Sequence, residues 1–203
     1  MIFRSGWSWF VSGLGIGQIC SWGALYYSFP LIAEAMGRDL GWSKTELYGA
    51  ATLGLLLAAA AAYPVGKAID RGYGRIIMSA GSLVAGVLLL AWSQVSALSI
   101  FLAITAALGA LQAAVLYEPA FAVIARHNGG GARGAITALT LWGGFASTVF
   151  IPLVQLMLDQ FDWRGALIGL GLITRCEICC TTDRSCAMNR KAVENSRWIS
   201  FSR

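Results

Sequence analysis

The feature that most restricts the fold of this chain is a succession of long apolar runs that carry almost no charge. Of its 203 residues, 57% are hydrophobic and 12% are charged. A soluble domain carries about 25% charged residues, and a compact fold of this size has too few interior positions to bury so much apolar surface. Helices in a lipid bilayer can expose such runs to hydrocarbon. The sequence therefore predicts an all-α membrane protein.

The apolar runs are long enough to be counted as spans, because a helix needs about 20 mostly apolar residues to cross a bilayer. We expect five complete transmembrane helices and a truncated sixth within a bundle of residues 1–174. As a helix, the truncated span would rise only about 18 Å, whereas the hydrocarbon core is about 30 Å thick. The predicted spans are residues 9–33, 45–66, 76–94, 98–125 and 134–158, with the start of the sixth at 163–174.

The connections between these runs carry recognisable turn signals. Ser43 and Glu46 form a Ser-x-x-Glu pattern, which predicts a capping box at the start of the second span. Gly72 and Gly74 allow a tight turn between the second and third spans. Residues 159–162 predict a short turn before the sixth.

Residues 175–203 differ in composition from the rest of the chain. This segment is polar and holds four of the five cysteines, and it begins in the middle of an apolar run. We interpret it as an out-of-frame or vector-derived tail. A zinc site or a cysteine-based membrane sensor is the alternative, but the spacing lacks a second Cys-x-x-Cys pair. We predict no metal and no cofactor. The tail cysteines are Cys176, Cys179, Cys180 and Cys186.

Basic residues lie beside the apolar runs and differ in number between the two sides of the membrane. The net charge of +5 would favour nucleic acid in a soluble protein, but here the membrane explains it and we expect no nucleic-acid partner. The side with more Lys and Arg faces the cytoplasm, which places the N-terminus there. That side holds Arg4, Lys67, Arg71, Arg75, Arg126 and Arg133, and the other holds Arg38, Lys44 and Arg164.

Glu118 is the sharpest candidate for a transport residue. It lies within the predicted fourth span, about 12 Å from the cytoplasmic end at the rise of a helix. A charge at that depth costs about 3 kcal/mol or more, so we predict reversible protonation or contact with a solute. The alternative is a protonated Glu118 that bonds to a neighbouring helix. Pro119 follows and frees a carbonyl one turn back, which loosens the helix.

Polar side chains also recur on single faces of the predicted helices. Gln18, Trp22 and Tyr26 are spaced by four and share one face of the first span. A second stripe, on the fifth span, contains Thr137, Gly144, Thr148 and Gln155, and Gln112 is a further candidate on the fourth span. These positions predict a lining for a solute cavity, with hydrogen bonds between helices as the alternative.

Small residues mark the faces where helices are expected to pack closely, because small side chains let two backbones approach each other in lipid. The predicted seams are Gly13 with Gly17, then Gly54, Ala58, Ala62 and Gly66, and then Ala106, Ala110 and Ala114.

The loop after the second span resembles a known signature. It reads Gly66-Lys67-Ala68-Ile69-Asp70-Arg71-Gly72-Tyr73-Gly74-Arg75, which is similar to the loop motif of major facilitator superfamily transporters, with one extra residue before the final Gly-Arg pair. The triplet Asp162-Trp163-Arg164 also resembles that family. The resemblance covers about residues 5–173 and corresponds to the N-terminal half, and more loosely to bacterial members related to monocarboxylate porters.

The resemblance implies secondary active transport of a small solute by alternating access between two six-helix halves, and no enzymatic activity. It implies a bacterial inner-membrane location, with the lipid bilayer, a small solute, and a missing C-terminal half or second chain as partners. Proton coupling of that solute is a further expectation, with Glu118 as its candidate residue. The loop motif consists of Gly66, Asp70, Arg71, Gly74 and Arg75. Its charged residues Asp70, Arg71 and Arg75 would latch the halves together, or only set topology as a solvated loop. The alternatives for the chain itself are a non-transporting membrane fragment and the cysteine sensor.

Overall fold

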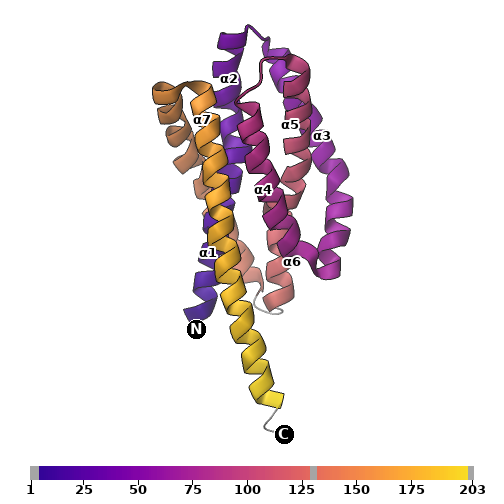
Figure 1. Ribbon diagram of the computed structural model, residues 1–203. Coiled ribbons are helices and arrows are strands. Elements are labelled where there is room, and N and C mark those ends of the chain that lie inside the picture. Colours follow the sequence, from indigo (N-terminus) through magenta and orange to yellow (C-terminus); the bar gives the residue numbers. More distant parts are fainter. Residues whose placement is uncertain (1–4, 129–131, 201–203) are drawn as a thin grey trace.

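The computed structural model describes residues 5–128 and 132–200, and the side chains of 13–175 except 75, 123 and 126–132. The helices run alongside one another as a bundle, and the end of α7 projects past the others (Figure 1). The elements are α1 (Ser5–Trp22), η1 (Gly23–Tyr27), α2 (Ser28–Leu40), α3 (Lys44–Ala68), η2 (Ile69–Tyr73), α4 (Gly74–Trp92), α5 (Leu98–Val115), α6 (Tyr117–Asn128) and α7 (Ala132–Ser200).

The predicted first span, residues 9–33, is part of a longer helical path from α1 through η1 to α2. The path changes to a π-helical turn at η1 and ends at Gly41, whose φ of 70° lies in the left-handed region. Glycine adopts that conformation without the strain that a Cβ would cause. The π-helical turn was not predicted, because one residue inserted into a helix leaves its apolar composition unchanged.

The predicted capping box at the start of α3 is confirmed. The Ser43 N–H donates to Glu46 Oε2 at 2.8 Å, and Ser43 Oγ accepts from the Glu46 N–H at 3.3 Å. At the other end of α3, η2 reverses the chain into α4, and Gly72 has a φ of 98°. Gly74, the other glycine predicted to make this turn, has an ordinary helical φ of −51°, so the turn depends on Gly72.

The predicted fourth span, residues 98–125, overlaps an apolar stretch over Leu98–Ala122 that is interrupted once. The backbone leaves the helix at Leu116, where ψ is −154°, and this break separates α5 from α6. The physical reason lies three residues on, in Pro119. Proline has no N–H to donate to the carbonyl four residues earlier, and its ring clashes with that carbonyl.

A second break divides α7 into a first arm (residues 132–161) and a second arm (residues 163–200). Asp162 at the break has a φ of 60° and a ψ of 176°, which confirms the predicted turn. The helical backbone of the second arm continues to Ser200, past the predicted end of the sixth span at residue 174. A helix needs only backbone hydrogen bonds to continue, so the polar composition of the predicted tail does not end it.

Hydrogen bonds fasten the start of the second arm to the ends of other helices. The buried Trp163 donates from Nε1 to Asp39 Oδ2 of α2 at 3.0 Å. Arg164 donates from Nη1 to the Ser93 carbonyl, at the end of α4, over 2.7 Å. Its guanidinium also lies 4.2 Å from the centre of the Trp163 ring. This group, the Trp163–Arg164 clamp, ties three helices together at one end of the bundle.

Glycines lie at the closest helix crossings, but only some of these glycines belong to the predicted seams. A Cβ on Gly54 would lie 3.0 Å from the Thr105 carbonyl, and Gly109 of α5 meets the Gly54 backbone, so α3 and α5 cross at this pair. Gly86 of α4 faces Gly171 of the second arm in the same way. The predicted seam residues Gly13 and Gly66 face open space instead.

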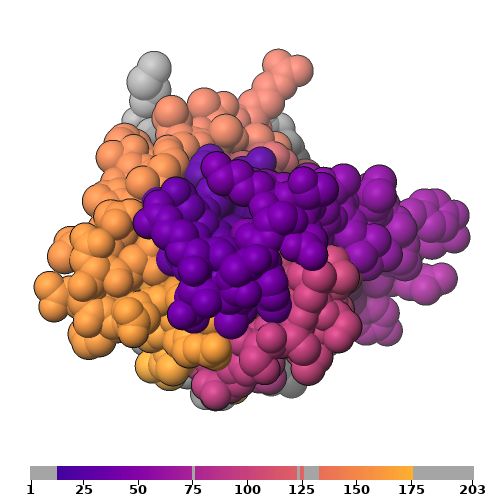
Figure 2. Space-filling model, turned by 90° about the horizontal axis from the view of Figure 1, so that it is seen from above, coloured from indigo at the N-terminus to yellow at the C-terminus, as the bar shows by residue number. Residues whose placement is uncertain are grey.

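Large side chains of the first arm fill the glycine positions of the α1–η1 path. A Cβ on Gly15 would lie 2.6 Å from the Trp142 side chain, and a Cβ on Gly23 would overlap the Phe150 ring. Seen from above, α7 lies on one side of the α1–α2 path and α3 on the other (Figure 2). The close contact is therefore between large side chains and glycines, and Gly13 of the predicted seam takes no part in it.

Three helical stretches of the described chain are long and apolar enough to cross a membrane: Lys44–Tyr73, Leu98–Ala122 and Arg133–Arg175. Ile76–Trp92 is a shorter apolar helix, and the third stretch contains the break at Asp162. Large apolar side chains such as Leu56 and Tyr63 of α3 are 64% and 69% exposed, as lipid-facing positions should be. The count of five complete spans is not confirmed.

Candidate functional site

Two irregular backbone segments lie together inside the bundle, and a proline follows each of them. In α5, the Val115 carbonyl would normally accept from residue 119, which is proline. In η1, Ser28 donates back to the Gly23 carbonyl, five residues earlier, as in a π-helix. The Leu25 carbonyl lies in the same irregular turn, five residues before Pro30.

Glutamine side chains donate hydrogen bonds to one backbone carbonyl in each of these two segments. Gln18 of α1 donates from Nε2 to the Val115 carbonyl at 3.1 Å, and at 3.5 Å to Leu116. Gln112 of α5 donates from Nε2 to the Leu25 carbonyl at 3.3 Å. We call this reciprocal pair the amide clasp. Because a buried carbonyl without a partner costs about 1–3 kcal/mol, the clasp explains why both irregular segments are tolerated.

Aromatic rings lie next to the amide clasp and form contacts between helices of the bundle. The Trp22 ring centre is 5.4 Å from that of Tyr26 and 4.8 Å from that of Tyr117 in α6. The Tyr117 ring also stacks on Phe121 at 5.2 Å. The Tyr117 hydroxyl lies so close to Gly143 of the first arm that a Cβ there would overlap it. Three helical segments therefore converge on Trp22 and Tyr117.

Two buried polar atoms in this group lack a hydrogen-bond partner among the described residues: Gln18 Oε1 and Trp22 Nε1. Gln18 is only 1% exposed. The two residues are one turn apart on the same face of α1. One atom is an acceptor and the other a donor, and buried polar atoms are usually paired, so this pair calls for an explanation.

The structure thus brings together Gln18, Trp22, Tyr26 and Gln112 of the predicted candidates. Sequence reasoning missed Tyr117, although its place before Glu118 and Pro119 was a usable signal. Glu118 itself is exposed, just after the break at Leu116. Its role in protonation or solute contact stays a prediction.

The stripe predicted on the fifth span lies along the exposed side of the first arm. Thr137, Gly144, Thr148 and Gln155 are all exposed. Thr137 Oγ1 donates to the Arg133 carbonyl at 3.0 Å, and Gln155 Nε2 donates to Asp159 Oδ1 at 2.9 Å. These bonds stay within the arm and do not join the stripe to the amide clasp.

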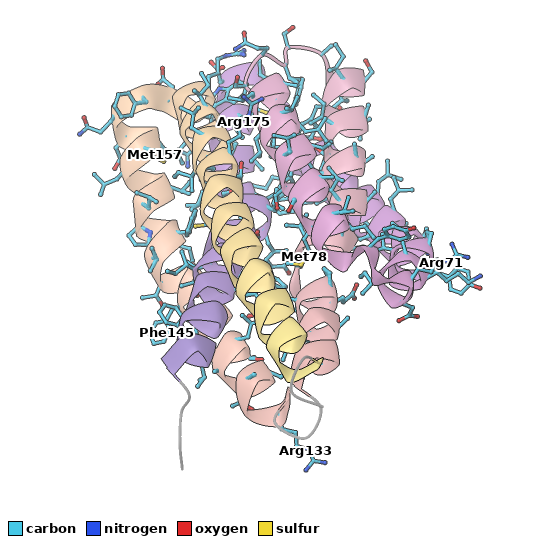
Figure 3. The ribbon with its side chains drawn as sticks, turned by 60° about the horizontal axis from the view of Figure 1, so that its bottom comes forward. Arg71, Met78, Arg133, Phe145, Met157 and Arg175 are labelled. Atoms are coloured by element: carbon cyan, nitrogen blue, oxygen red, sulfur yellow. The ribbon has the colours of Figure 1, made fainter. Side chains whose placement is uncertain are left out.

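The signature loop lies at the far end of α3. Asp70 and Arg71 are exposed, and Arg71 points away from the bundle (Figure 3). The Lys67 ammonium lies 4.5 Å from the Tyr63 ring centre. Gly66 faces open space and Gly74 begins α4, whereas the side chain of Arg75 is outside the described residues. A latch to a second half stays a prediction. The tail cysteines are also outside the residues whose side chains are described.

Comparison with known proteins agrees with the resemblance of the loop. Monocarboxylate transporter 11 of Homo sapiens is 33% identical over 181 residues, which cover 83% of this chain and 36% of that protein. Monocarboxylate transporter 13 of Rattus norvegicus is 27% identical over 185 residues, covering 86% of this chain and 41% of that protein. No solved structure matches the chain.

These relatives are transporters and not enzymes, which confirms the prediction that the chain belongs to no enzyme class. They are mammalian, so the predicted bacterial membrane stays a prediction. The chain spans about two fifths of their length, between 36% and 41%. The family model described as Major Facilitator Superfamily matches residues 14–176. The chain therefore belongs to the Major Facilitator Superfamily, a family of multi-pass membrane transporters.

Proposed function

We propose that this chain is the N-terminal membrane half of a secondary transporter that moves a small monocarboxylate by alternating access. Family membership supports transport, and the names of the relatives suggest the solute class. The observation that carries the proposal is the amide clasp. Irregular backbone at membrane depth is tolerated where it is buried in protein or lines a cavity, and broken helices form the solute sites of many transporters.

The residues around the clasp have distinct proposed roles. Trp22, Tyr26 and Tyr117 would contact the solute, and the clasp would hold the two irregular segments at a fixed distance. Glu118, exposed beside them, would carry the coupled proton or contact the solute. Thr137, Thr148 and Gln155 of the first arm would face the cavity that the second half completes, and this exposed polar stripe supports that assignment.

We further propose that residues 1–174 form the bundle, with five complete spans and part of a sixth. The family match ends at residue 176, which supports a change of character near the start of the polar tail. The basic loops support a cytoplasmic N-terminus, in a bacterial cell membrane. The second half would correspond to the part of the relatives that this chain does not cover. Asp70 and Arg71 would contact that half.

Equilibrium binding tests this function. The chain is placed in lipid nanodiscs, and binding of ¹⁴C-propionate is measured with unlabelled propionate, succinate and glucose as competitors. We expect saturable binding that propionate displaces and that succinate and glucose do not. A folded chain that binds no monocarboxylate, or that binds all three solutes equally, would contradict the proposal and favour a non-transporting membrane fragment.

A further inference from the structure

We infer that Gln18 Oε1 and Trp22 Nε1 together bind the neutral, protonated carboxyl group of the solute. This inference rests on the proposed function and adds which atoms recognise the solute and in which protonation state. It starts from the two buried atoms that lack partners among the described residues.

The orientation of the Gln18 amide is determined by its hydrogen bonds. Its Nε2 donates to the Val115 carbonyl at 3.1 Å, a carbonyl that Pro119 leaves without a helical donor. Rotating the amide by half a turn would place Oε1 against that carbonyl oxygen, where two acceptors would repel each other. Oε1 must therefore be the atom that faces away from the clasp as an acceptor.

The Trp22 indole supplies the complementary donor. Gln18 and Trp22 are separated by one helical turn, about 6 Å along the axis. A neutral carboxyl group offers one O–H donor and one carbonyl acceptor, whereas a carboxylate offers acceptors only. The O–H would donate to Gln18 Oε1 and the carbonyl would accept from Trp22 Nε1. A carboxylate could satisfy Trp22 but would meet an acceptor at Gln18.

The surrounding charges favour the same form of the solute. Residues 13–27 and 98–125 contain no lysine or arginine, so these segments offer an anion no counter-charge. The nearby titratable groups are Tyr26 and Tyr27 of η1 with Tyr117 and Glu118 of α6. The first arm contributes the uncharged side chains of Trp142 and Phe150, at its contacts with Gly15 and Gly23. None of these is a cation.

Both atoms are buried in the described packing, so this conformation is closed around the pair. The Trp22–Tyr117 contact, with ring centres 4.8 Å apart, joins α1 to α6 next to it. Separation of these rings would open the pair to a solute. A water molecule also has a donor and an acceptor and could pair with both atoms. The experiment must therefore distinguish a site that binds a carboxyl group from a site that binds only water.

A ligand series tests the inference on the unaltered chain in nanodiscs between pH 5 and 8. Propionate affinity should fall about tenfold per pH unit, because that is how the neutral fraction falls above the pKa of the acid. Propionamide, which has the same donor and acceptor but does not ionise, should compete with an affinity independent of pH. Methyl propionate has no donor and should compete poorly. A pH-dependent affinity for propionamide would mean that a group of the protein, and not the solute, takes up the proton, and would overturn the inference.

Trp22→Phe provides a matched variant, since it removes the indole N–H and keeps a ring against Tyr117. We expect both propionic acid and propionamide to bind roughly fivefold more weakly. Trp92→Phe is the control, because the Trp92 N–H already has a partner, Met36 Sδ, at 3.4 Å. If Trp22→Phe fails to fold, the ligand series alone decides the matter.

The outcomes separate the two proposals. Propionate binding that is independent of pH and unaffected by propionamide would overturn this inference, leave monocarboxylate binding standing, and indicate that the pair holds water only. Absence of monocarboxylate binding at every pH would overturn both.

Discussion

At the scale of single residues, the structure explains why a proline and two glutamines occur where they do. Pro119 removes a donor from the Val115 carbonyl and Gln18 returns one, while Gln112 donates to the Leu25 carbonyl of the opposite segment. A proline in one helix therefore determines which polar residue the facing helix needs. This dependence can be measured as a coupling between substitutions.

Gln18→Leu should lower the free energy of unfolding by about 1–3 kcal/mol, because it leaves the Val115 carbonyl buried without a donor. Pro119→Ala restores a backbone N–H for that carbonyl, so the double variant should recover much of the loss. Unfolding by steric trapping or by a denaturing detergent measures the cycle. Gln155→Leu, at an exposed position, is the control. Strictly additive effects of the two substitutions would refute the pairing.

Gly143→Ala should destabilise the chain by about 1–3 kcal/mol, because the new Cβ would overlap the Tyr117 hydroxyl. Tyr117→Phe removes that hydroxyl but keeps the ring carbons, which would lie 2.6 and 2.9 Å from the new Cβ, so it should relieve only part of the loss. The neighbouring Gly144 faces open space, so Gly144→Ala should change stability by a few tenths of a kcal/mol at most. Equal effects at the two glycines would show that Tyr117 does not pack on the first arm.

At the scale of elements, composition was enough to predict the apolar helices, the capping box and the turn at Asp162, because each has a local signal. Pro119 also gave a local reason for the loosening of the fourth span. The partner of the freed carbonyl could not be predicted, since it comes from a residue far along the chain. Gly13 and Gly15 look alike in sequence, and only the path of the first arm makes Gly15 the contact.

The Trp163–Arg164 clamp should stabilise the end of the bundle where three helices meet. Arg164→Ala should cost about 1–3 kcal/mol, because the Ser93 carbonyl loses a charged donor at 2.7 Å. Arg38→Ala is the matched control, since Arg38 pairs with Glu34 on an exposed surface, where such pairs contribute about 0–1 kcal/mol. Thermal unfolding in detergent compares them, and an equal cost for both would argue against the clamp.

At the scale of the whole molecule, large apolar side chains are exposed on both α3 and the first arm, and the first arm also carries the polar stripe. The apolar surfaces suit lipid, and under the proposed function the polar stripe meets a second half, in a chain that spans about two fifths of its relatives' length. Proteoliposomes that contain this chain alone should therefore take up no more ¹⁴C-propionate than protein-free liposomes. Uptake above that level would mean that two copies complete the cavity.

The central claim is that a small monocarboxylate reaches the amide clasp. The most direct measurement is ¹⁹F NMR of the chain labelled with 5-fluorotryptophan in nanodiscs, with resonances assigned from Trp22→Phe and Trp92→Phe. The account predicts that the Trp22 resonance shifts saturably with propionate and not with succinate, while that of Trp92 stays in place. A Trp22 resonance that does not move while propionate binds would contradict it.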